Sequence, residues 1–269
     1  MNFVIHGMKY HVEVCGNGYP LLLLHGFTGS SSAWLPFSEE WSAQSRLIMP
    51  DLAGHGETEA PADLQRYKIE SVAHDLNQLL EELDIDQVDV LGYSMGGRLA
   101  LTFAILFPEK VRKLVLVSST AGIQTEEDRN SRRMKDAQLA KFIKDEGVPA
   151  FIRYWENIPL FQSMANLPDW IKNAVRSQRL QNTPEGLANS LLGMGTGSQP
   201  SWWGKLGTLT LPILLLTGSD DEKFCRIASE MQKKLKRADW ICVEGSGHAI
   251  HVEKSEKFGT IVSEFLLNT

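Results

Sequence analysis

Three residues that could together perform base or nucleophilic chemistry follow apolar runs in this 269-residue chain: Ser94, Asp221 and His248. A serine hydroxyl is a poor nucleophile or base by itself. It needs a neighbouring imidazole, whose tautomer is held by a carboxylate. In a parallel sheet, groups that follow the strands gather at the carboxyl edge. The order serine, acid, histidine therefore predicts a triad in which His248 and Asp221 activate Ser94.

The serine lies in the run 92–96, Gly-Tyr-Ser-Met-Gly, between an apolar run that begins at Val88 and an apolar, helix-like segment. The glycines at 92 and 96 remove side chains that would clash in a tight turn. We therefore expect the Ser94 hydroxyl at the tip of the turn, beside the positive end of the helix. The pattern alone is weak evidence, because an ordinary turn with a capping serine would share it. The flanking strand and helix favour the nucleophile.

Both partners of the serine have competitors in the sequence. Asp220 precedes Asp221 in the run 218–221, where the Gly-x-x-Asp spacing favours Asp221. His251 comes shortly after His248 and resembles the start of the next helix. The remaining histidines lie in a helical pattern or precede the serine, and they do not fit the order: His6, His11, His25, His55 and His74.

A triad of this kind also needs donors that stabilise negative charge on a substrate oxygen. The backbone N–H of Met95, directly after the serine, is one candidate. The N–H of Phe27 is the second, because the run 25–27 (His-Gly-Phe) follows an unbroken apolar run at 20–24 that is typical of a buried strand. A plain turn is the weaker alternative for this run.

The elements that must position these residues alternate between strand-like and helix-like patterns. A hairpin is expected around residues 3–14, and a helix within 30–41. Apolar spacing predicts further helices over 69–83, after the serine, over 223–236 and from about residue 253. Strands are predicted over 21–24, 46–49, 88–91, 111–117, 212–218 and 240–243. This alternation with short links predicts a mostly parallel sheet flanked by helices.

The alternation stops after Ser118 and returns at Pro212. Between them, residues 124–203 show helical patterns and no convincing strand, with breaks near Pro149, Pro159, Pro168 and Pro184. We therefore predict one α/β core, made of residues 1–118 and 207–269, with an inserted helical cap at 119–206.

Composition narrows the possible partners. The net charge of −6 argues against nucleic acid. No apolar run has the length of a membrane span, and the N-terminus lacks the pattern of a signal peptide. Cys15, Cys225 and Cys242 have neither metal nor redox spacing, which favours free thiols in a reducing cytoplasm. The predicted cap is slightly basic in an otherwise acidic chain, which favours an anionic ligand. We expect a monomer or a weak homo-oligomer.

Over nearly its whole length the chain resembles proteins of the α/β-hydrolase fold. The motifs His-Gly-Phe, Asp51-Leu-Ala-Gly-His-Gly, Gly-x-Ser-x-Gly, Gly-x-x-Asp and a late Gly-His appear in order. Within that fold it is similar to the 2-succinyl-6-hydroxy-2,4-cyclohexadiene-1-carboxylate synthase family of menaquinone biosynthesis. The closer match rests on Arg98 after the serine turn, Gly122-Ile123 before a helix with Arg129 and Arg132, Trp155 with Pro159-Leu160-Phe161, the run 195–200 (Gly-Thr-Gly-Ser-Gln-Pro), and the acid loop ending in Lys223-Phe224.

The resemblance implies a lyase that uses no metal or organic cofactor. The family eliminates pyruvate from 2-succinyl-5-enolpyruvyl-6-hydroxy-3-cyclohexene-1-carboxylate. By this resemblance, Ser94 is the base that removes a ring proton, activated by His248 and Asp221. The N–H groups of Phe27 and Met95 then hold the negative charge that develops on the succinyl carbonyl.

Such a small-molecule substrate carries three carboxylates, which arginine can bind in bidentate fashion. Arg98 lies one helical turn after Ser94, close enough to touch a bound ligand. The other residues expected at the pocket are Arg129, Arg132 and Arg179, with Arg133 and Arg176 as weaker candidates and Tyr93 and Trp155 as walls. Solvated surface charge is the alternative for each arginine, and core packing for the two aromatic residues.

Two other functions fit parts of the pattern. A carboxylesterase or carbon–carbon bond hydrolase would use the same triad, but we would expect it to have an apolar cap rather than these arginines. A non-catalytic carboxylate-binding module would be expected to have lost the triad, whose three members are present in this sequence.

Overall fold

An eight-stranded sheet forms the centre of the computed structural model, which describes residues 1–267. The strands lie in the order β1-β2-β4-β3-β5-β6-β7-β8. All pairs from β4 to β8 are parallel, whereas β2 pairs antiparallel with β1 and β4, so the predicted mostly parallel sheet is confirmed. The strands are β1 (Asn2–Ile5), β2 (Met8–Cys15), β3 (Tyr19–Leu24), β4 (Ser45–Pro50), β5 (Val88–Tyr93), β6 (Val111–Val117), β7 (Ile213–Gly218) and β8 (Ala238–Val243).

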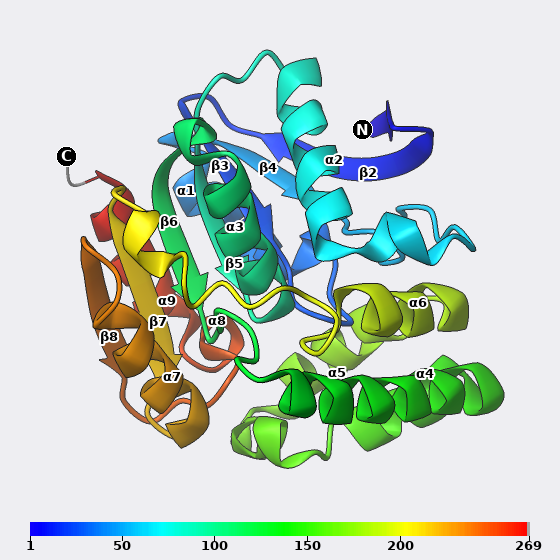
Figure 1. Ribbon diagram of the computed structural model, residues 1–269. Helices are drawn as coiled ribbons and strands as arrows, with labels where there is room; N and C mark the ends of the chain where they lie inside the picture. The colour runs from blue at the N-terminus through cyan, green and yellow to red at the C-terminus, as the bar shows by residue number, and fades with distance from the viewer. Residues whose placement is uncertain (268–269) are drawn as a thin grey trace.

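Strand β3 illustrates how helices cover both faces of the sheet. Because successive side chains of a strand point to opposite faces, Leu22 and Leu24 join one apolar cluster, while Leu21 and Leu23 join another. The first cluster contains side chains of α2 (Ile69–Glu82), α3 (Met95–Leu106) and α7 (Glu222–Gln232). The second contains side chains of α1 (Ser38–Trp41) and α9 (Ser255–Leu267). Figure 1 shows α2 and α3 in front of the sheet.

Between β6 and β7 the chain forms three helices, α4 (Glu126–Trp155), α5 (Asp169–Arg179) and α6 (Pro184–Met194), and residues 118–212 contain no strand. Helix α4 bends at Gly147, where φ is 78°. It packs on α6 through a third apolar cluster that includes Phe151 and Leu187. The three helices lie together beyond the carboxyl ends of β6 and β7 (Figure 1). The division into core and cap at residues 119 and 206 stays a prediction.

Two predicted helices take a different form in the structure. The segment 30–41 contains a 3-10 helix (Ser31–Phe37) followed by the single turn α1, since Pro36 has no N–H to give to an α-helical bond. The terminal helix is split into α8 (Ile250–Glu253) and α9, because the backbone of Lys254 is not helical. Short 3-10 helices also form at Leu64–Tyr67, Pro108–Lys110, Pro159–Asn166 and Leu206–Thr208.

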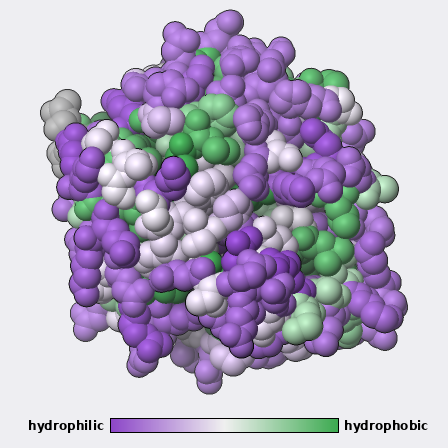
Figure 2. Space-filling model, viewed as in Figure 1, coloured by the Kyte–Doolittle hydropathy of each residue, from purple (hydrophilic) through white to green (hydrophobic). Residues whose placement is uncertain are grey.

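Among residues 1–267, no helix combines the length and apolar character needed to cross a membrane. On the face drawn in Figure 2, hydrophilic residues predominate and apolar residues form small separate patches. Many large apolar side chains, such as those of Trp34 and Phe103, are instead buried, although Trp170 is 73% exposed.

We expect Gly96→Ala to destabilise the protein strongly, because the start of α3 touches the end of β3. A Cβ at Gly96 would lie 2.1 Å from the carbonyl oxygen of Leu24, which is backbone and cannot swing away. The expected loss in the free energy of unfolding is about 3 kcal/mol or more, measured by urea titration. Gly204→Ala is the control, since a Cβ there would meet nothing within 4 Å. Equal stability of the two variants would contradict this contact.

Candidate active site

Ser94 lies in the turn between β5 and α3, in a backbone conformation that few residues other than glycine adopt. Its φ is 52° and its ψ is −105°. Strain of this kind costs about 1–3 kcal/mol and persists where the surroundings enforce it. Here they do so through close backbone contact: a Cβ on Gly92 would lie 2.2 Å from the carbonyl oxygen of Gly96. The predicted tight strand-to-helix turn is present.

His248 brings together two residues that are far apart in the sequence. Its Nε2 lies 2.9 Å from Ser94 Oγ, and its Nδ1 lies 2.7 Å from Asp221 Oδ2. Because an ionised carboxylate accepts hydrogen bonds and cannot donate them, Nδ1 carries the proton, and Nε2 is left to accept the proton of the serine. The His248 side chain is buried, as is Asp221. This is the geometry of a serine made basic by an oriented imidazole.

The neighbouring acids Asp220 and Asp221 point in different directions. Asp221 caps the N-terminus of α7, where its Oδ1 accepts the N–H of Phe224 at 3.3 Å, and its Oδ2 faces His248. Asp220 is exposed and accepts the hydroxyl of Ser219 at 2.9 Å. The contact with the histidine is therefore made by Asp221.

The two backbone groups expected to bind a substrate oxygen lie on adjoining segments. Phe27 and Met95 both line the cavity that contains Ser94. The end of β3 and the start of α3 are in backbone contact, which holds these segments together. Among residues 1–267, neither N–H has a hydrogen-bond acceptor outside its own helix or turn. A helix-start N–H such as that of Met95 has no intrahelical partner. Both groups are thus free to donate.

A cavity of about 540 Å³ is lined by Ser94 and His248. Its walls are mainly apolar and aromatic, and both predicted wall residues, Tyr93 and Trp155, belong to them. Phe27 packs edge-on against Trp155, with ring centres 5.5 Å apart. A cavity that combines apolar and aromatic walls with polar side chains is typical of a small-molecule site.

Arg98 and Arg132 place positive charge in this cavity. The buried Arg98 donates to the carbonyl oxygen of Met194 at 2.7 Å and to the side-chain amide oxygen of Gln199. Arg132 donates through Nε to Asp136 at 2.8 Å. Burial, together with the charge of Arg132, lowers the pKa of Arg98 to about 9, so Arg98 remains charged at neutral pH. The cavity lining also contains Lys223 and the acidic residues Asp128 and Glu230. The guanidinium groups of Arg98 and Arg132 are suited to bind the carboxylates of an anionic ligand.

Arg129, Arg133 and Arg176 do not line the cavity of Ser94, and for Arg129 this corrects the prediction. Arg129 and Arg133 border an outer surface pocket, where both contact the carbonyl oxygen of Gly197 and Glu126. Residues three apart on a helix project about 60° from each other, so Arg132 can face the cavity while Arg129 does not. Arg176 forms an ion pair with Glu156 at the surface.

Arg179 lies in a second cavity of about 340 Å³, which shares Phe27, Tyr93 and Phe161 as walls with the first. Its guanidinium carbon is 5.0 Å from the centre of the Phe161 ring. Arg179 is 8% exposed, it makes no ion pair among residues 1–267, and burial lowers its pKa. Arg179, which was predicted to bind the substrate, thus lies in a cavity that is separated from the cavity of Ser94 by shared wall residues.

Among the polar residues of the cavity lining that the sequence reasoning missed are Ser118, Ser119 and Lys223. The hydroxyls of Ser118 and Ser119 are buried and have no hydrogen-bond partner within residues 1–267. Lys223 lies in the first turn of α7, two residues after Asp221. All three follow the carboxyl ends of β6 or β7. This position in the sequence could have identified them, because side chains from that edge reach the site.

Two buried histidines predict that the protein loses stability in acid. Burial lowers the pKa of His55 to about 3, and burial with the nearby His248 does the same for His251. Below their ordinary pKa of 6.5, the unfolded chain binds protons that the folded chain does not. The free energy of unfolding therefore falls as pH drops from about 6.5 towards 3, by about 1.4 kcal/mol per pH unit for each histidine.

The matching experiment compares urea titrations at pH 7 and pH 5 for the wild type and His251→Gln. The variant lacks one of these titrating groups, so its loss of stability on acidification should be smaller by about 2 kcal/mol. An equal loss in both proteins would mean that His251 takes up its proton in the folded state.

Comparisons with known proteins agree with this architecture. A family model described as alpha/beta hydrolase fold matches residues 19–255. A Bacillus subtilis (strain 168) protein, provisionally named as a 2-succinyl-6-hydroxy-2,4-cyclohexadiene-1-carboxylate synthase, is 48% identical over 98% of this chain and 96% of its own length.

Two solved structures resemble the whole chain. MenH from S. aureus superposes with a TM-score of 0.91 and 34% identity, covering 96% of this chain and 97% of that one. A malate-bound thermophilic esterase from Thermogutta terrifontis superposes with a TM-score of 0.85 and 26% identity, covering 99% and 97%. The resemblance inferred from the motifs is confirmed: the chain belongs to the α/β-hydrolase fold family and, within it, to the family of 2-succinyl-6-hydroxy-2,4-cyclohexadiene-1-carboxylate synthases.

Proposed function

We propose that this protein is a lyase of menaquinone biosynthesis. It eliminates pyruvate from 2-succinyl-5-enolpyruvyl-6-hydroxy-3-cyclohexene-1-carboxylate and leaves 2-succinyl-6-hydroxy-2,4-cyclohexadiene-1-carboxylate. The observation that carries the proposal is that Ser94 and His248, the latter oriented by Asp221, line the same cavity as Arg98 and Arg132. The name of the B. subtilis relative supports the same reaction.

In the proposed reaction Ser94 acts as a base. Its Oγ gives a proton to His248 Nε2 and removes the ring proton next to the succinyl carbonyl, whose oxygen takes up the electron pair. The N–H groups of Phe27 and Met95 stabilise that oxygen. The electron pair then returns from the carbonyl oxygen to the ring and forms a new ring double bond. The double bond already in the ring shifts by one position, and the C–O bond to the enolpyruvyl group breaks. The released enolate takes the proton from His248 and becomes pyruvate, while Asp221 stabilises the imidazolium.

The substrate's three carboxylates need cationic partners. Arg98 and Arg132 supply two from inside the cavity, and Lys223 supplies a third positive charge at its rim. Arg179 adds a further cationic contact to the substrate only if the shared wall formed by Phe161 shifts. Predominantly apolar walls strengthen each charge pair by excluding water.

The deciding experiment measures pyruvate release from the enolpyruvyl cyclohexene substrate, with lactate dehydrogenase as the reporter and p-nitrophenyl acetate as a parallel substrate. We expect saturable pyruvate release far above the uncatalysed background, and little ester cleavage. Background pyruvate release beside brisk ester cleavage would overturn the lyase proposal.

An esterase is the second candidate, because the same triad serves acyl transfer and the chain resembles the T. terrifontis esterase over its whole length. A carboxylate-binding module without activity is the third possibility, and turnover of neither substrate would favour it. We also propose that the protein acts in the cytoplasm as a monomer or weak homo-oligomer. The free cysteines support a reducing compartment, and light scattering measures the assembly state.

A further inference from the structure

Asn182, in the link between α5 and α6, lies between two loops of the core. Its side chain is 7% exposed. Its Nδ2 donates to the carbonyl oxygens of Thr28 and Arg179 at 2.9 and 3.0 Å, and its Oδ1 accepts the N–H of Gly56 at 3.2 Å. The amide orientation follows from these partners, since a carbonyl must face a donor and an amino group must face acceptors. One side chain thus connects the helical segment to both loops.

The first loop is the turn 26–29, which carries Phe27. The N–H of Gly29 donates to the carbonyl oxygen of Gly26 at 3.0 Å and closes the turn. Thr28 has a φ of 70°, which is uncommon for a β-branched residue and costs about 1–3 kcal/mol unless contacts hold it. The carbonyl of this strained residue receives the Asn182 amide. A restraint at Thr28 limits how the preceding Phe27 peptide can turn.

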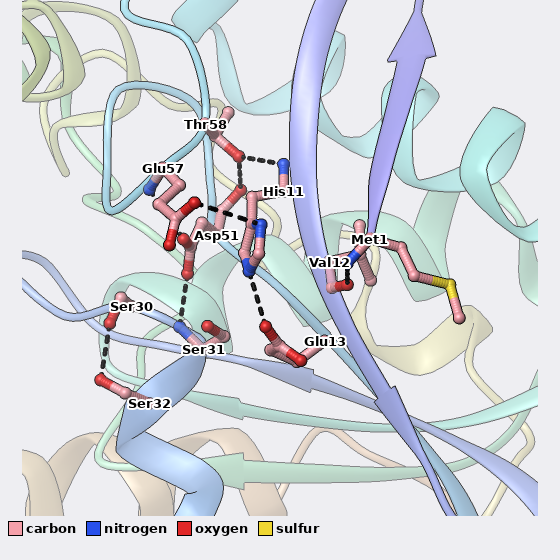
Figure 3. A network of polar contacts seen from close by, with 10 residues as sticks. All are labelled: Met1, His11, Val12, Glu13, Ser30, Ser31, Ser32, Asp51, Glu57 and Thr58. Atoms are coloured by element: carbon pink, nitrogen blue, oxygen red, sulfur yellow. Dashed lines mark hydrogen bonds and ion pairs between the residues drawn. The ribbon is translucent and has the colours of Figure 1, made fainter.

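The second loop, residues 51–58, is a firm anchor. The Asp51 carboxylate accepts the N–H of Ser31 at 2.6 Å and that of Glu57 at 2.8 Å, and the Thr58 hydroxyl donates to the Asp51 carbonyl oxygen at 2.7 Å (Figure 3). The backbone of Gly56 lies so close to the Asp51 carboxylate that a Cβ on Gly56 would be 2.2 Å from Asp51 Oδ2. Through Gly56, Asn182 therefore ties the strained turn to a loop that is itself well fixed.

We propose that Asn182 is a positioning residue that holds the turn 26–29 so that the N–H of Phe27 points into the reaction cavity. The inference rests on the proposed role of this N–H as an oxyanion donor. Because Asn182 belongs to the α5–α6 link, the donor is in place when that link is seated on the core. Loss of the Asn182 amide leaves the triad intact and displaces one donor, so it affects the transition state more than substrate binding.

The test uses phenylboronic acid, whose boron bonds to a serine oxygen and leaves a negatively charged tetrahedral centre with an oxygen at the oxyanion position. His248 takes the serine proton as the B–O bond forms. Binding is followed by calorimetry in the wild type, Asn182→Asp, Asn182→Ala and the control Gln178→Ala. Asn182→Asp keeps the acceptor for Gly56 and loses the donor to Thr28, while Asn182→Ala removes both without adding charge.

We expect each Asn182 variant to bind the boronate about tenfold more weakly and to lose about tenfold or more in kcat for pyruvate release, with KM within threefold. Gln178 makes a different link from α5 to the core, through the hydroxyls of Ser30 and Ser32. Gln178→Ala should therefore keep boronate affinity within twofold. Thermal melts identify the variants that are folded. Two Asn182 variants are made so that the test can be completed even if one of them does not fold.

The outcomes separate this inference from the proposed function. Wild-type affinity for the boronate in a folded Asn182 variant would overturn the positioning role and leave the lyase proposal intact. If the wild type releases no pyruvate but the Asn182 variants bind the boronate more weakly than it does, the positioning role is supported and the proposed substrate is wrong. Absence of boronate binding in the wild type would overturn the oxyanion role of Phe27, and the inference with it.

Discussion

Ser94→Ala is expected to lower kcat for pyruvate release by about 10³-fold or more, with little change in KM. In the structure His248 Nε2 faces Ser94 Oγ at 2.9 Å. Removing the oxygen leaves a gap between the imidazole and the ring proton that the imidazole cannot bridge. The arginines proposed to bind the substrate are untouched, so binding should persist. Initial rates with the lactate dehydrogenase reporter measure both constants.

Two adjacent acids provide a matched control for the same prediction. Asp221→Asn should lower kcat by about 10²–10⁴-fold, because an amide no longer favours the tautomer with the proton on Nδ1. Asp220→Asn should stay within twofold of the wild type, since the Asp220 carboxylate contacts Ser219 and not His248. Full activity of Ser94→Ala would contradict the role of the serine and make His248 itself the base.

Arg98→Lys is expected to lower kcat/KM for the tricarboxylate by about 10²-fold, mainly by raising KM. The guanidinium is buried in the cavity that Ser94 also lines, where an ion pair with a carboxylate is poorly screened. Lysine keeps the charge and loses the planar fork that binds two oxygens. Loss of a buried, charge-assisted contact costs about 2–5 kcal/mol, which is consistent with this factor.

The control for Arg98→Lys must separate binding from folding, because Arg98 also bonds to Met194 and Gln199. Thermal melts of the variant set the assay temperature well below its transition. Arg153→Lys replaces an exposed arginine on α4 and should leave KM within twofold. If KM is unchanged in Arg98→Lys, the buried guanidinium serves packing alone and another cation binds the substrate.

Local patterns in the sequence were sufficient to predict most of the sheet and the triad. Unbroken apolar runs such as 20–24 form strands because both faces of a parallel sheet are covered, and this requirement is visible in the sequence. The run 92–96 predicts the serine turn because a backbone this close to its neighbours tolerates only glycine at 92 and 96. The order of Ser94, Asp221 and His248 then followed from the edge at which parallel strands end.

The cap was less predictable, because its helices place charged residues by rotation about the helix axis. Arg129 and Arg132 are equally good ligands by type and spacing, yet the packing of α4 against α6 turns Arg132 into the cavity and Arg129 towards Gly197. Arg179 was predicted at the pocket, and the ring of Phe161 stands between it and Ser94.

By itself, the sequence determined the order of strands and helices, the tight turn at Ser94 and the identity of the triad, because each depends on residue type within a short stretch or on chain order. Only the tertiary structure decided which arginines share a cavity with the serine, that Lys223 joins them, and that Asn182 reaches Thr28 across 154 residues of chain. Contacts of this kind depend on the angle at which helices pack, and that angle is set by the sum of many side chains rather than by any one motif.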